Sequence, residues 1–492
     1  MEFVDRITET ERLTRILNGE SSSLVIIRGR RRLGKSTLIK RVLTENDIYY
    51  EADKTDASNQ RFLLANVASL VFPGLDAANY PTWEALLMAI NYRVERKMTL
   101  CLDEFPYLAK VSPELPSVIQ KLLDNGNLKY NVILCGSSQT MMYDLLYNES
   151  SPLYGRAESD FKLNAIRLPF LQKALKLDAI ETIEEYALWG GVPRYWVLRE
   201  KSGDKDEALR EHVLSSQGIL YEEPQRLFND DVSDIMKIST LMSIIGKGAT
   251  RMKEIAARCE EPATNLSRPI GKLVDLGYIE RDIPFGESSK TTKRSLYRIA
   301  DPFLSFHFRF VAPMRSFIEL ERYAPVDAVL KNQLSSHVGS WWERICRDAV
   351  TGNVIDGVMY GEARRWWGSI LMDGKPQDIE LDVVAESLDK KTILLGECKW
   401  TTIENARHLT DHLKNIAEHL PFAKDRTLVI KLFLKNPPQE PQGNHLLAED
   451  VINYFHIEGA GHVLVRGAKE KGGVRGTKAL EEAEALGRAI AQ

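Results

Sequence analysis

Short apolar runs alternate with longer helical stretches over the first 200 residues of the chain. The apolar runs cover residues 24–27, 48–52, 98–104, 131–138 and 162–168. Between them, residues 36–43 and 58–97 are interpreted as helices, the second stretch broken at Pro73 and Pro81. A short amphipathic helix is expected before Gly19, with Leu13 and Leu17 on its apolar face. Strands that alternate with helices predict a parallel sheet in an α/β fold.

The middle of the chain changes to a helical pattern. Helices are expected at 234–246, 252–259 and 263–276, followed by two short strands around a polar loop at 286–293. Three helices and a two-stranded wing predict a winged helix-turn-helix. The polar residues that would face DNA are Asn265, Ser267, Arg268, Lys272, Lys290, Lys293 and Arg294. A packing or protein-contact role remains open, and Pro269 with Glu260 and Glu261 weakens the DNA interpretation.

The C-terminal part returns to strands and helices. A helix is expected at 333–351, and strands at 358–360, 365–368, 379–386, 392–398 and 427–434, with a further helix at 405–419. A Gly- and Lys/Arg-rich stretch opens the tail at 467–492. These changes predict four parts, at residues 1–200, 201–315, 316–466 and 467–492.

Composition limits the function classes. The chain has 492 residues, 27% of them charged, and a net charge of −4, so any nucleic-acid binding must come from a local basic patch. A charged N-terminus and the lack of an 18-residue apolar run exclude a secretion signal and a membrane span. Cys101, Cys135 and Cys398 lie in apolar runs, as expected for reduced thiols of a cytoplasmic protein.

A phosphate-binding loop follows the first apolar run. Gly29 is separated by four residues from Gly34-Lys35-Ser36, between an expected strand and an expected helix. The glycines let backbone N–H groups turn toward phosphate oxygens, Lys35 would reach the β- and γ-phosphates, and Ser36 would offer its hydroxyl to Mg²⁺. The expected cofactors are therefore ATP and Mg²⁺. The predicted contacts of the loop are Gly29, Arg30, Arg31, Arg32, Leu33, Gly34, Lys35, Ser36 and Thr37.

Acidic residues end the third apolar run. Asp103 is expected to hold Mg²⁺, and Glu104 to polarise the attacking water. Ser137 would lie beside the γ-phosphate if its strand neighbours the Asp103 strand; a plain polar turn is the alternative. Arg156 follows a constrained turn and is a candidate arginine for the γ-phosphate, from the same chain or from a neighbouring subunit of a homo-oligomer. A surface ion pair is the alternative for Arg156.

These motifs occur in a recognisable order. The runs FVDRITE, GRRRLGKS, LCLDEF, LCGSS, SPLYGR and GGVPRY together resemble the archaeal-type ATPase family, a branch of the AAA+/STAND-like ATPases. The resemblance covers residues 1–200. It implies a P-loop AAA+-like sheet of five parallel strands with a helical lid, and it makes Pro193 an adenine-side contact.

A second group of charged residues lies near the C-terminus. Glu397 and Lys399 are two residues apart on an expected strand and therefore share a face, which Asp382 on the preceding strand could approach. Two carboxylates and a lysine suit Mg²⁺ and phosphodiester hydrolysis, with Asp382 and Glu397 as metal ligands. The pattern resembles the PD-(D/E)xK restriction-endonuclease-like fold, with Leu381 in place of the usual proline. Glu343 matches the extra acid of that family.

Together these features predict an ATPase that couples nucleotide hydrolysis to the recognition or the Mg²⁺-dependent cleavage of nucleic acid, with DNA favoured. The alternative is a nucleotide switch whose C-terminal nuclease-like fold binds a partner without catalysis. An inactive nuclease fold or a plain ion pair on a strand is the alternative for Asp382, Glu397 and Lys399.

Overall fold

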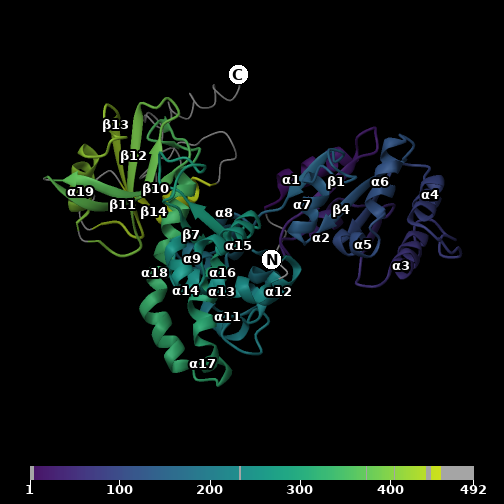
Figure 1. Cartoon of the computed structure of the whole chain (residues 1–492), viewed down its shortest axis with the longest axis horizontal. Helices are drawn as coiled ribbons and strands as arrows, with labels where there is room; N and C mark the ends of the chain where they lie inside the picture. Colours follow the sequence, from purple (N-terminus) through teal and green to yellow (C-terminus); the bar gives the residue numbers. More distant parts are fainter. Residues whose placement is uncertain (1–4, 232–233, 373, 404, 439–444, 456–492) are drawn as a thin grey trace. The chain divides into compact units, whose positions relative to one another are not determined.

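The fold is described from a computed structural model of the chain (Figure 1). It covers residues 5–231, 234–372, 374–403, 405–438 and 445–455. The chain divides into two compact units. Unit 1 comprises residues 1–166, 192–198 and 222–235, and unit 2 comprises residues 167–191, 199–221 and 236–492. The predicted tail at 467–492 lies outside the described residues.

Unit 1 contains a five-stranded sheet in which all strands are parallel. The strands follow the order β2-β3-β4-β1-β5. They are β1 (Leu24–Arg28), β2 (Ile48–Glu51), β3 (Met98–Asp103), β4 (Tyr130–Gly136) and β5 (Ser159–Lys162). The α/β class with a parallel five-stranded sheet is therefore confirmed. The carboxyl ends of β1, β3 and β4 meet at one edge, where ligands bind in open α/β sheets.

Helices cover both faces of this sheet. On one face, α1 (Ile7–Leu17) and α2 (Lys35–Val42) pack against alternate residues of β1, β3 and β4. The helices that pack on the other face are α3 (Ala57–Ser69), α4 (Trp83–Arg93), α5 (Phe105–Val111), α6 (Leu115–Asp124) and α7 (Gln139–Tyr147). Strands β1, β3 and β4 are buried on both faces, which explains why they read as continuous apolar runs.

The position of the last strand differs from the sequence prediction. Residues 162–168 were expected to form it, but β5 is Ser159–Lys162 and α8 begins at Leu168. Two polar residues of β5 hide the strand from a search for apolar runs: Ser159 is buried, and Asp160 binds Arg28 on β1 at 2.7 Å. The helix starts early because Pro169 occupies its first turn, where a proline is favourable.

Unit 2 begins with helices. These are α8 (Leu168–Leu175), α9 (Ala179–Trp189), α11 (Lys205–His212), α13 (Ile235–Gly246), α14 (Met252–Cys259), α15 (Ala263–Asp275), α16 (Pro302–Phe306) and α17 (Arg315–Glu319), with single turns at His307–Val311 and Ala312–Met314. A hairpin of β6 (Ile279–Asp282) and β7 (Leu296–Ile299) follows α15. The three helices and two strands expected in this region are present. Two further helices, α10 (Pro193–Lys201) and α12 (Glu223–Asp231), lie wholly or largely in segments of unit 1.

A mixed sheet forms the C-terminal part of unit 2. Its order is β10-β11-β12-β13-β14, with antiparallel pairs at β10–β11–β12 and parallel pairs at β12–β13–β14. The strands are β10 (Arg364–Met372), β11 (Lys375–Glu386), β12 (Thr392–Lys399), β13 (Thr427–Leu434) and β14 (His445–Leu447). The hairpin β8 (Val354–Ile355) and β9 (Val358–Met359) precedes them, and α20 (Ala448–Asn453) follows.

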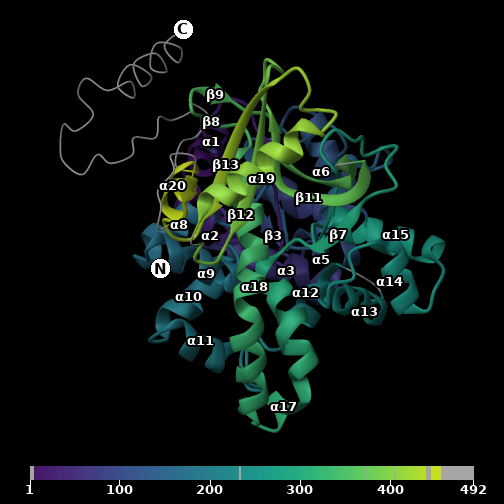
Figure 2. The same cartoon turned by 90° about the vertical axis from the view of Figure 1, so that its left-hand side faces the viewer.

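Two helices cover opposite faces of the C-terminal sheet. The long helix α18 (Tyr323–Val350), seen lengthwise in Figure 2, packs on one face, and α19 (Ala406–Glu418) packs on the other. Helix α18 begins ten residues before the predicted start, since Pro325 falls in its first turn and does not interrupt it. This sheet positions Asp382 on β11 and both Glu397 and Lys399 on β12.

The connection between β6 and β7 is packed against the C-terminal sheet. The Phe285 N–H donates to the Arg365 carbonyl at 2.8 Å, and the Phe285 ring lies 5.3 Å from that of Phe422. Arg294 lies so close to Gly368 that a Cβ atom there would come within 2.9 Å of its guanidinium. The loop of the β6–β7 hairpin is thus held against strand β10 and does not project freely.

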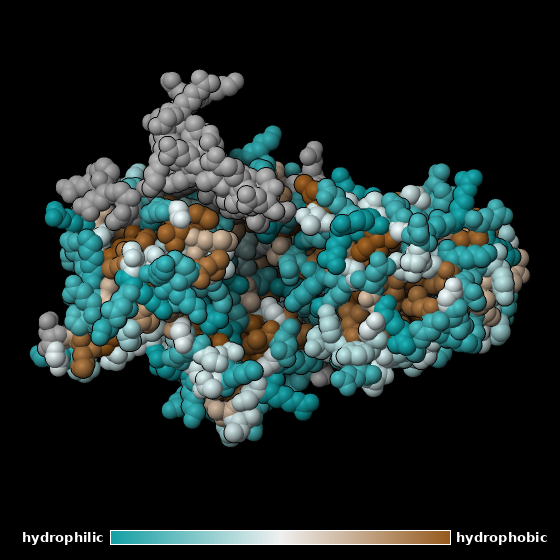
Figure 3. All heavy atoms as spheres, turned by 90° about the horizontal axis from the view of Figure 1, so that it is seen from above, coloured by the Kyte–Doolittle hydropathy of each residue, from teal (hydrophilic) through white to brown (hydrophobic). Residues whose placement is uncertain are grey.

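The surface shown in Figure 3 is mainly hydrophilic, with apolar residues in scattered patches. In the part of the chain that the structure describes, no helix has both the length and the apolarity needed to span a membrane.

Candidate functional site

The loop between β1 and α2 has the backbone shape that a phosphate-binding loop requires. Gly29 has φ 150° and Gly34 has φ 87°. A Cβ atom at Gly29 would lie 2.6 Å from the Leu163 carbonyl oxygen, so only glycine fits there. Arg32 also adopts a positive φ, of 70°. Because α2 starts at Lys35, the N–H groups of its first turn point toward the loop.

Lys35 lies inside this loop. Its ammonium group donates to the carbonyl oxygens of Gly29 at 2.8 Å and Arg30 at 3.1 Å, and the side chain is buried. A cation held at the centre of a loop beside a helix N-terminus is suited to neutralising phosphate oxygens.

Ser36 and Asp103 form a direct contact across the loop. The Ser36 hydroxyl donates to Oδ2 of Asp103 at 2.6 Å, and the Tyr49 hydroxyl donates to the same oxygen at 2.5 Å. Burial pushes the pKa of Asp103 upward, but hydrogen bonds from Cys135, Ser36, Tyr49 and the Glu104 N–H bring the net shift below the ordinary value. Asp103 is thus an ionised carboxylate although it is only 1% exposed.

Glu104 is oriented by the neighbouring strand. Both of its carboxylate oxygens accept from the Ser137 hydroxyl, at 2.9 and 2.8 Å, and one also accepts from the Ser137 N–H at 3.3 Å. Glu104 has a left-handed backbone with φ 52° at the start of α5. Since β4 pairs with β3, the neighbour relation on which the Ser137 prediction depended is present. In this structure Ser137 contacts Glu104.

Helix α12 supplies two carboxylates near this edge that the sequence did not suggest. Glu223, 1% exposed, pairs with Arg32 of the loop at 2.7 Å and accepts from the Tyr195 hydroxyl at 3.0 Å. Burial raises the pKa of Glu223, and Arg32 opposes that shift. Asp231 accepts from the Gln139 N–H at the start of α7, at 2.9 Å. Glu223 lies 191 residues beyond Arg32 in the chain, and no spacing rule links them.

The donor set of unit 1 fits ATP and Mg²⁺ by its chemistry. A buried ammonium and a helix N-terminus suit phosphate oxygens, and a hydroxyl in contact with an ionised carboxylate is the oxygen pair that Mg²⁺ prefers. The groups concerned are the Lys35 ammonium, the Ser36 hydroxyl and the Asp103 carboxylate.

Arg156 lies away from this edge, which corrects one of its predicted roles. Its guanidinium binds Asp124 through two nitrogens, at 2.9 and 3.0 Å, and donates to the Pro152 carbonyl. Arg156 precedes β5 and Asp124 precedes β4, so both lie at the amino ends of parallel strands, opposite the phosphate-binding loop. An arginine at that edge cannot reach a γ-phosphate in its own unit. The alternative of a surface ion pair describes it correctly, and action on a neighbouring subunit stays a prediction.

Pro193 is the first residue of α10 and lies in the short segment 192–198 that belongs to unit 1. Its neighbour Tyr195 contacts Glu223. The segment is therefore linked to the loop through Glu223 and Arg32. The adenine-side role of Pro193 stays a prediction.

The C-terminal site is centred on an irregularity in β11. Arg364 pairs with Val384 and Trp366 with Leu381, so β11 holds one extra residue opposite Arg365. Asp382 lies in this bulge, and bulges often redirect a side chain at a functional site. Its Oδ2 accepts from the Cys398 N–H at 2.9 Å, and its carbonyl accepts from Arg347 at 3.0 Å. Burial raises the pKa of the Asp382 carboxyl above its ordinary value.

Glu397 and Lys399 flank Cys398 on β12. Cys398 packs into the core beneath α18, so by strand alternation Glu397 and Lys399 point to the opposite face. Their charged groups are 2.6 Å apart. Burial, followed by the nearby Asp382 charge, raises the pKa of Glu397, and the pairing with Glu397 outweighs burial and raises the pKa of Lys399. The structure thus brings the three predicted residues together.

Glu343 on α18 completes the acidic group. Burial, and then the charge of Asp382, raises its pKa to about 8. Its carboxylate lies 3.8 Å from Arg365, which also pairs with Glu380. Within the described ranges, no three His, Cys, Asp or Glu side chains are arranged to hold one metal ion. The carboxylates are neighbours but do not form a closed ligand set.

Of the residues predicted to face DNA, Asn265, Ser267 and Arg268 on α15 are exposed, as are Lys290 and Lys293 in the hairpin loop. Lys272 is half-buried. Arg294 is instead paired with Glu287 at 2.6 Å and lies against Gly368.

Two segments of the chain match known families. Residues 3–197 match a family described as an ATPase domain found predominantly in archaea. Residues 307–410 match a family described as archaeal and bacterial proteins of unknown function. The chain is also 27% identical over 410 residues to the uncharacterized protein MJECL04 of Methanocaldococcus jannaschii, an alignment that covers 82% of this chain and 88% of its relative.

A solved structure supports the fold. The Walker-type ATPase PABY2304 of Pyrococcus abyssi matches with a TM-score of 0.50 and 19% identity, over 63% of this chain and 96% of that one. The ORC2 protein of Aeropyrum pernix, in its ADPNP–ADP complexes, matches with a TM-score of 0.44 and 15% identity, over 64% and 94%; this second likeness is too distant to support a conclusion. The expected archaeal ATPase domain is confirmed. The N-terminal part of the chain thus matches an archaeal ATPase domain, and a later segment matches archaeal and bacterial proteins of unknown function.

Proposed function

We propose that unit 1 binds and hydrolyses ATP at the edge formed by the phosphate-binding loop, Asp103 and Glu104. One observation carries the proposal: the Ser36 hydroxyl meets an ionised Asp103 carboxylate at 2.6 Å beside the buried Lys35 ammonium. Ser36 at the start of α2 and Asp103 at the end of β3 are 67 residues apart in sequence, and their meeting beside Lys35 is the arrangement that nucleotide hydrolysis needs.

Each residue has a distinct role in this proposal. Lys35 neutralises charge on the phosphates, and Ser36 with Asp103 holds Mg²⁺, which supplies further charge neutralisation. Glu104 accepts a proton from the attacking water, and Ser137 holds its carboxylate in place. Pro193 contacts the adenine from its position at the start of α10.

Replacing Lys35 tests the binding step. We expect Lys35→Ala to weaken ATP binding about 10- to 100-fold, because charge-assisted hydrogen bonds to phosphate each contribute about 1.5–3 kcal/mol. Isothermal titration calorimetry with a non-hydrolysable ATP analogue measures the change. Lys110→Ala, an exposed lysine on α5, is the matched control and should bind as the parent does. Equal affinity of Lys35→Ala and the parent would show that the loop is not the nucleotide site.

We further propose that nucleotide turnover is coupled to a nucleic acid, with DNA favoured, and that unit 2 cleaves it at Asp382, Glu397 and Lys399. Support comes from the β11 bulge at Asp382 and from the hydrogen bond that ties its carboxylate to the residue between Glu397 and Lys399. In a PD-(D/E)xK-like site the two carboxylates would hold Mg²⁺, and Lys399 would stabilise charge on the scissile phosphate.

A second function is favoured by one specific observation. Lys399 is paired with Glu397 at 2.6 Å, and within the described residues no three potential ligands surround a metal position. A strand ion pair of this kind suits a unit that binds a partner without catalysis, with unit 1 acting as a nucleotide switch. The winged-helix elements α13, α14, α15, β6 and β7 could serve either function.

A cleavage assay separates the two functions. We expect the parent to cut single- or double-stranded DNA with Mg²⁺ or Mn²⁺, and Lys399→Ala to cut about 100-fold more slowly, as when a transition-state donor is removed. Lys424→Ala, an exposed lysine after α19, is the matched control. Comparing both with Lys35→Ala in the presence of ATP reports on coupling. Undetectable cleavage by the parent under every condition would favour the switch.

A further inference from the structure

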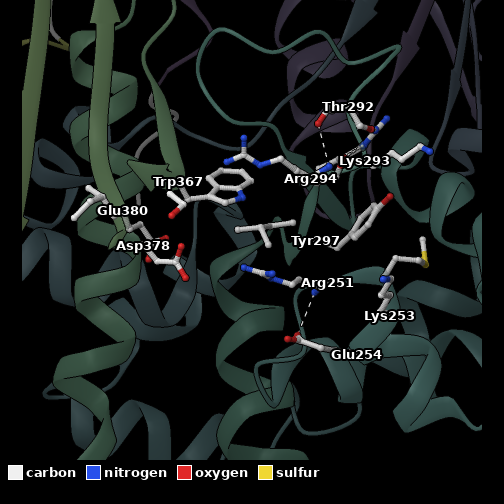
Figure 4. A pocket seen from close by; sticks show the side chains of 17 residues that line it. Arg251, Lys253, Glu254, Thr292, Lys293, Arg294, Tyr297, Trp367, Asp378 and Glu380 are labelled. Atoms are coloured by element: carbon white, nitrogen blue, oxygen red, sulfur yellow. Dashed lines mark hydrogen bonds between the residues drawn. The ribbon is translucent and has the colours of Figure 1, made fainter. Parts of the chain in front are cut away.

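Unit 2 contains a cavity that does not include Asp382, Glu397 or Lys399. Its volume is about 850 Å³, and its walls come from the start of α14, the β6–β7 hairpin and the strands β10 and β11 (Figure 4). Figure 4 shows Arg251 and Tyr297 projecting between a helical wall that carries Lys253 and a strand wall that carries Asp378 and Glu380. The volume is at the upper end of the range of about 300–1,000 Å³ found for sites that bind small organic ligands.

The helical and hairpin walls are mainly cationic, although Glu254 also lines the helical wall. The side-chain charges of Arg251, Lys253 and Lys293 have no carboxylate partner among the residues that the structure describes. Glu254 accepts instead from the Arg251 backbone N–H at 3.3 Å. The Arg281 guanidinium donates to the Ser295 hydroxyl and the Thr292 carbonyl. Positive side chains that outnumber the acidic ones on these two walls attract phosphate groups. The overall charge of −4 makes this local patch distinctive.

The strand wall has a different chemistry. Trp367 on β10 lies directly across from Glu380 on β11, and Ser369 lies across from Asp378. Aromatic rings such as Trp367 and Tyr297 offer surfaces on which bases stack. Carboxylates repel phosphates but accept hydrogen bonds from the amino groups of bases. The cavity therefore has one side suited to a sugar-phosphate backbone and another suited to bases.

This separation fits an unpaired strand and disfavours a duplex. In a duplex the bases face each other inside two phosphate backbones and cannot stack on a protein side chain. The hairpin loop that would enter a groove is held against β10 through Phe285 and Arg294. A hairpin fixed in this way forms a wall of the cavity.

We propose that this cavity binds single-stranded nucleic acid, with phosphates on Arg251, Lys253 and Lys293 and bases against Tyr297 and Trp367. This inference rests on the proposed function only for the class of ligand, nucleic acid. It depends neither on ATP hydrolysis nor on cleavage at Asp382, Glu397 and Lys399. Glu380 in the wall lies two residues before Asp382 on β11 and shares Arg365 with Glu343. A strand in the cavity would thus lie next to the candidate cleavage site.

Binding of a labelled ten-nucleotide oligothymidylate, followed by fluorescence anisotropy in EDTA and without ATP, tests the proposal. Under these conditions neither hydrolysis nor cleavage contributes, so the result is independent of both. Replacing Arg251, Lys253 and Lys293 together with glutamine should weaken binding at least about tenfold. It should also reduce the slope of log Kd against log salt by about 2, at about 0.7 per phosphate contact.

A second variant tests the base-stacking side. Tyr297→Leu should weaken oligothymidylate binding about fivefold or more while leaving the salt slope unchanged. The matched control replaces Lys110, Lys331 and Lys424 with glutamine, which removes the same charge from exposed positions outside the cavity. This control should bind as the parent does.

Three results would overturn the proposal. The first is equal binding by the parent and the cavity variant. The second is a duplex of the same length that binds the parent more tightly than the single strand. The third is competition by AMP or thymidine monophosphate at the same concentration as the oligomer, which would identify a mononucleotide site.

Discussion

Glu104→Gln should lower kcat for ATP hydrolysis by about 10²- to 10⁴-fold, the range typical of a lost general base. Binding of ATP should change little, because Glu104 contacts the Ser137 hydroxyl and N–H and does not belong to the loop around Lys35. Glutamine keeps the size of the side chain but cannot accept the proton. Phosphate release under single-turnover conditions measures the chemical step, and titration with ATP measures binding.

Ser137→Ala serves as the companion variant. Ser137 is a positioning residue, so its loss should reduce kcat less than Glu104→Gln does and leave the KM for ATP almost unchanged. Glu114→Gln, at an exposed position before α6, is the control for removing one carboxylate. Hydrolysis by Glu104→Gln at the parent rate would assign the base to another residue. The left-handed backbone at Glu104, which costs about 1–2 kcal/mol for a residue with a Cβ, is a local cost that an essential carboxylate would explain.

Acid should destabilise unit 2 through two buried histidines. His307 and His337 are 4% and 1% exposed, and each Nε2–H donates to a backbone carbonyl, of Tyr221 at 3.0 Å and of Ala187 at 2.8 Å. Burial lowers the pKa of each to about 4, and nearby Arg315 and Arg309 add to the shift.

The folded protein loses stability as pH falls because the pKa of both histidines is lower in the folded than in the unfolded chain. Between pH 6.5 and 4 the unfolded chain takes up protons that the folded chain does not, so stability falls as pH falls. From pH 6.5 to 5 each histidine should cost about 2 kcal/mol, at 1.36 kcal/mol per pH unit. The double variant His307→Gln/His337→Gln keeps an N–H donor but cannot ionise. Urea unfolding at pH 7 and pH 5 should therefore show a smaller loss for the variant.

Carboxylates also titrate over this pH range. The decisive quantity is therefore the loss of free energy of unfolding between pH 7 and pH 5 in the variant, compared with the same loss in the parent. His419→Gln is the control, because His419 is exposed and should leave the loss unchanged. If the double variant and the parent lose the same free energy of unfolding, the two histidines are not held neutral in the folded protein.

Sequence patterns predicted the sheet of unit 1 well where strands are buried on both faces. Apolar runs located β1, β3 and β4, and the fixed spacing of the phosphate-binding loop placed Lys35 and Ser36. The prediction for β5 was wrong because its strand contains Asp160, whose charge is neutralised by Arg28 on a strand distant in sequence. A local sequence pattern carries no information about a partner residue 132 positions away.

The same limit applies to the sites. The sequence was enough to predict that Asp382, Glu397 and Lys399 lie close together. It needed only two adjacent strands and the alternation of side chains along each of them. The contacts of Glu223 with Arg32 and of the β6–β7 loop with β10 depend on packing between segments far apart in the chain. Arg156 shows the reverse case, because its motif suggested catalysis and the strand direction places it at the other edge.

The division of the chain has a consequence for dissecting the protein. Because unit 1 is built from residues 1–166, 192–198 and 222–235, the backbone passes between the units five times. A protein shortened at residue 200 would retain the phosphate-binding loop but lose Glu223, so Arg32 would lose its buried partner. Its ATPase rate would then describe a damaged domain. The activity of each unit is therefore better tested by point substitutions in the full chain than by truncation.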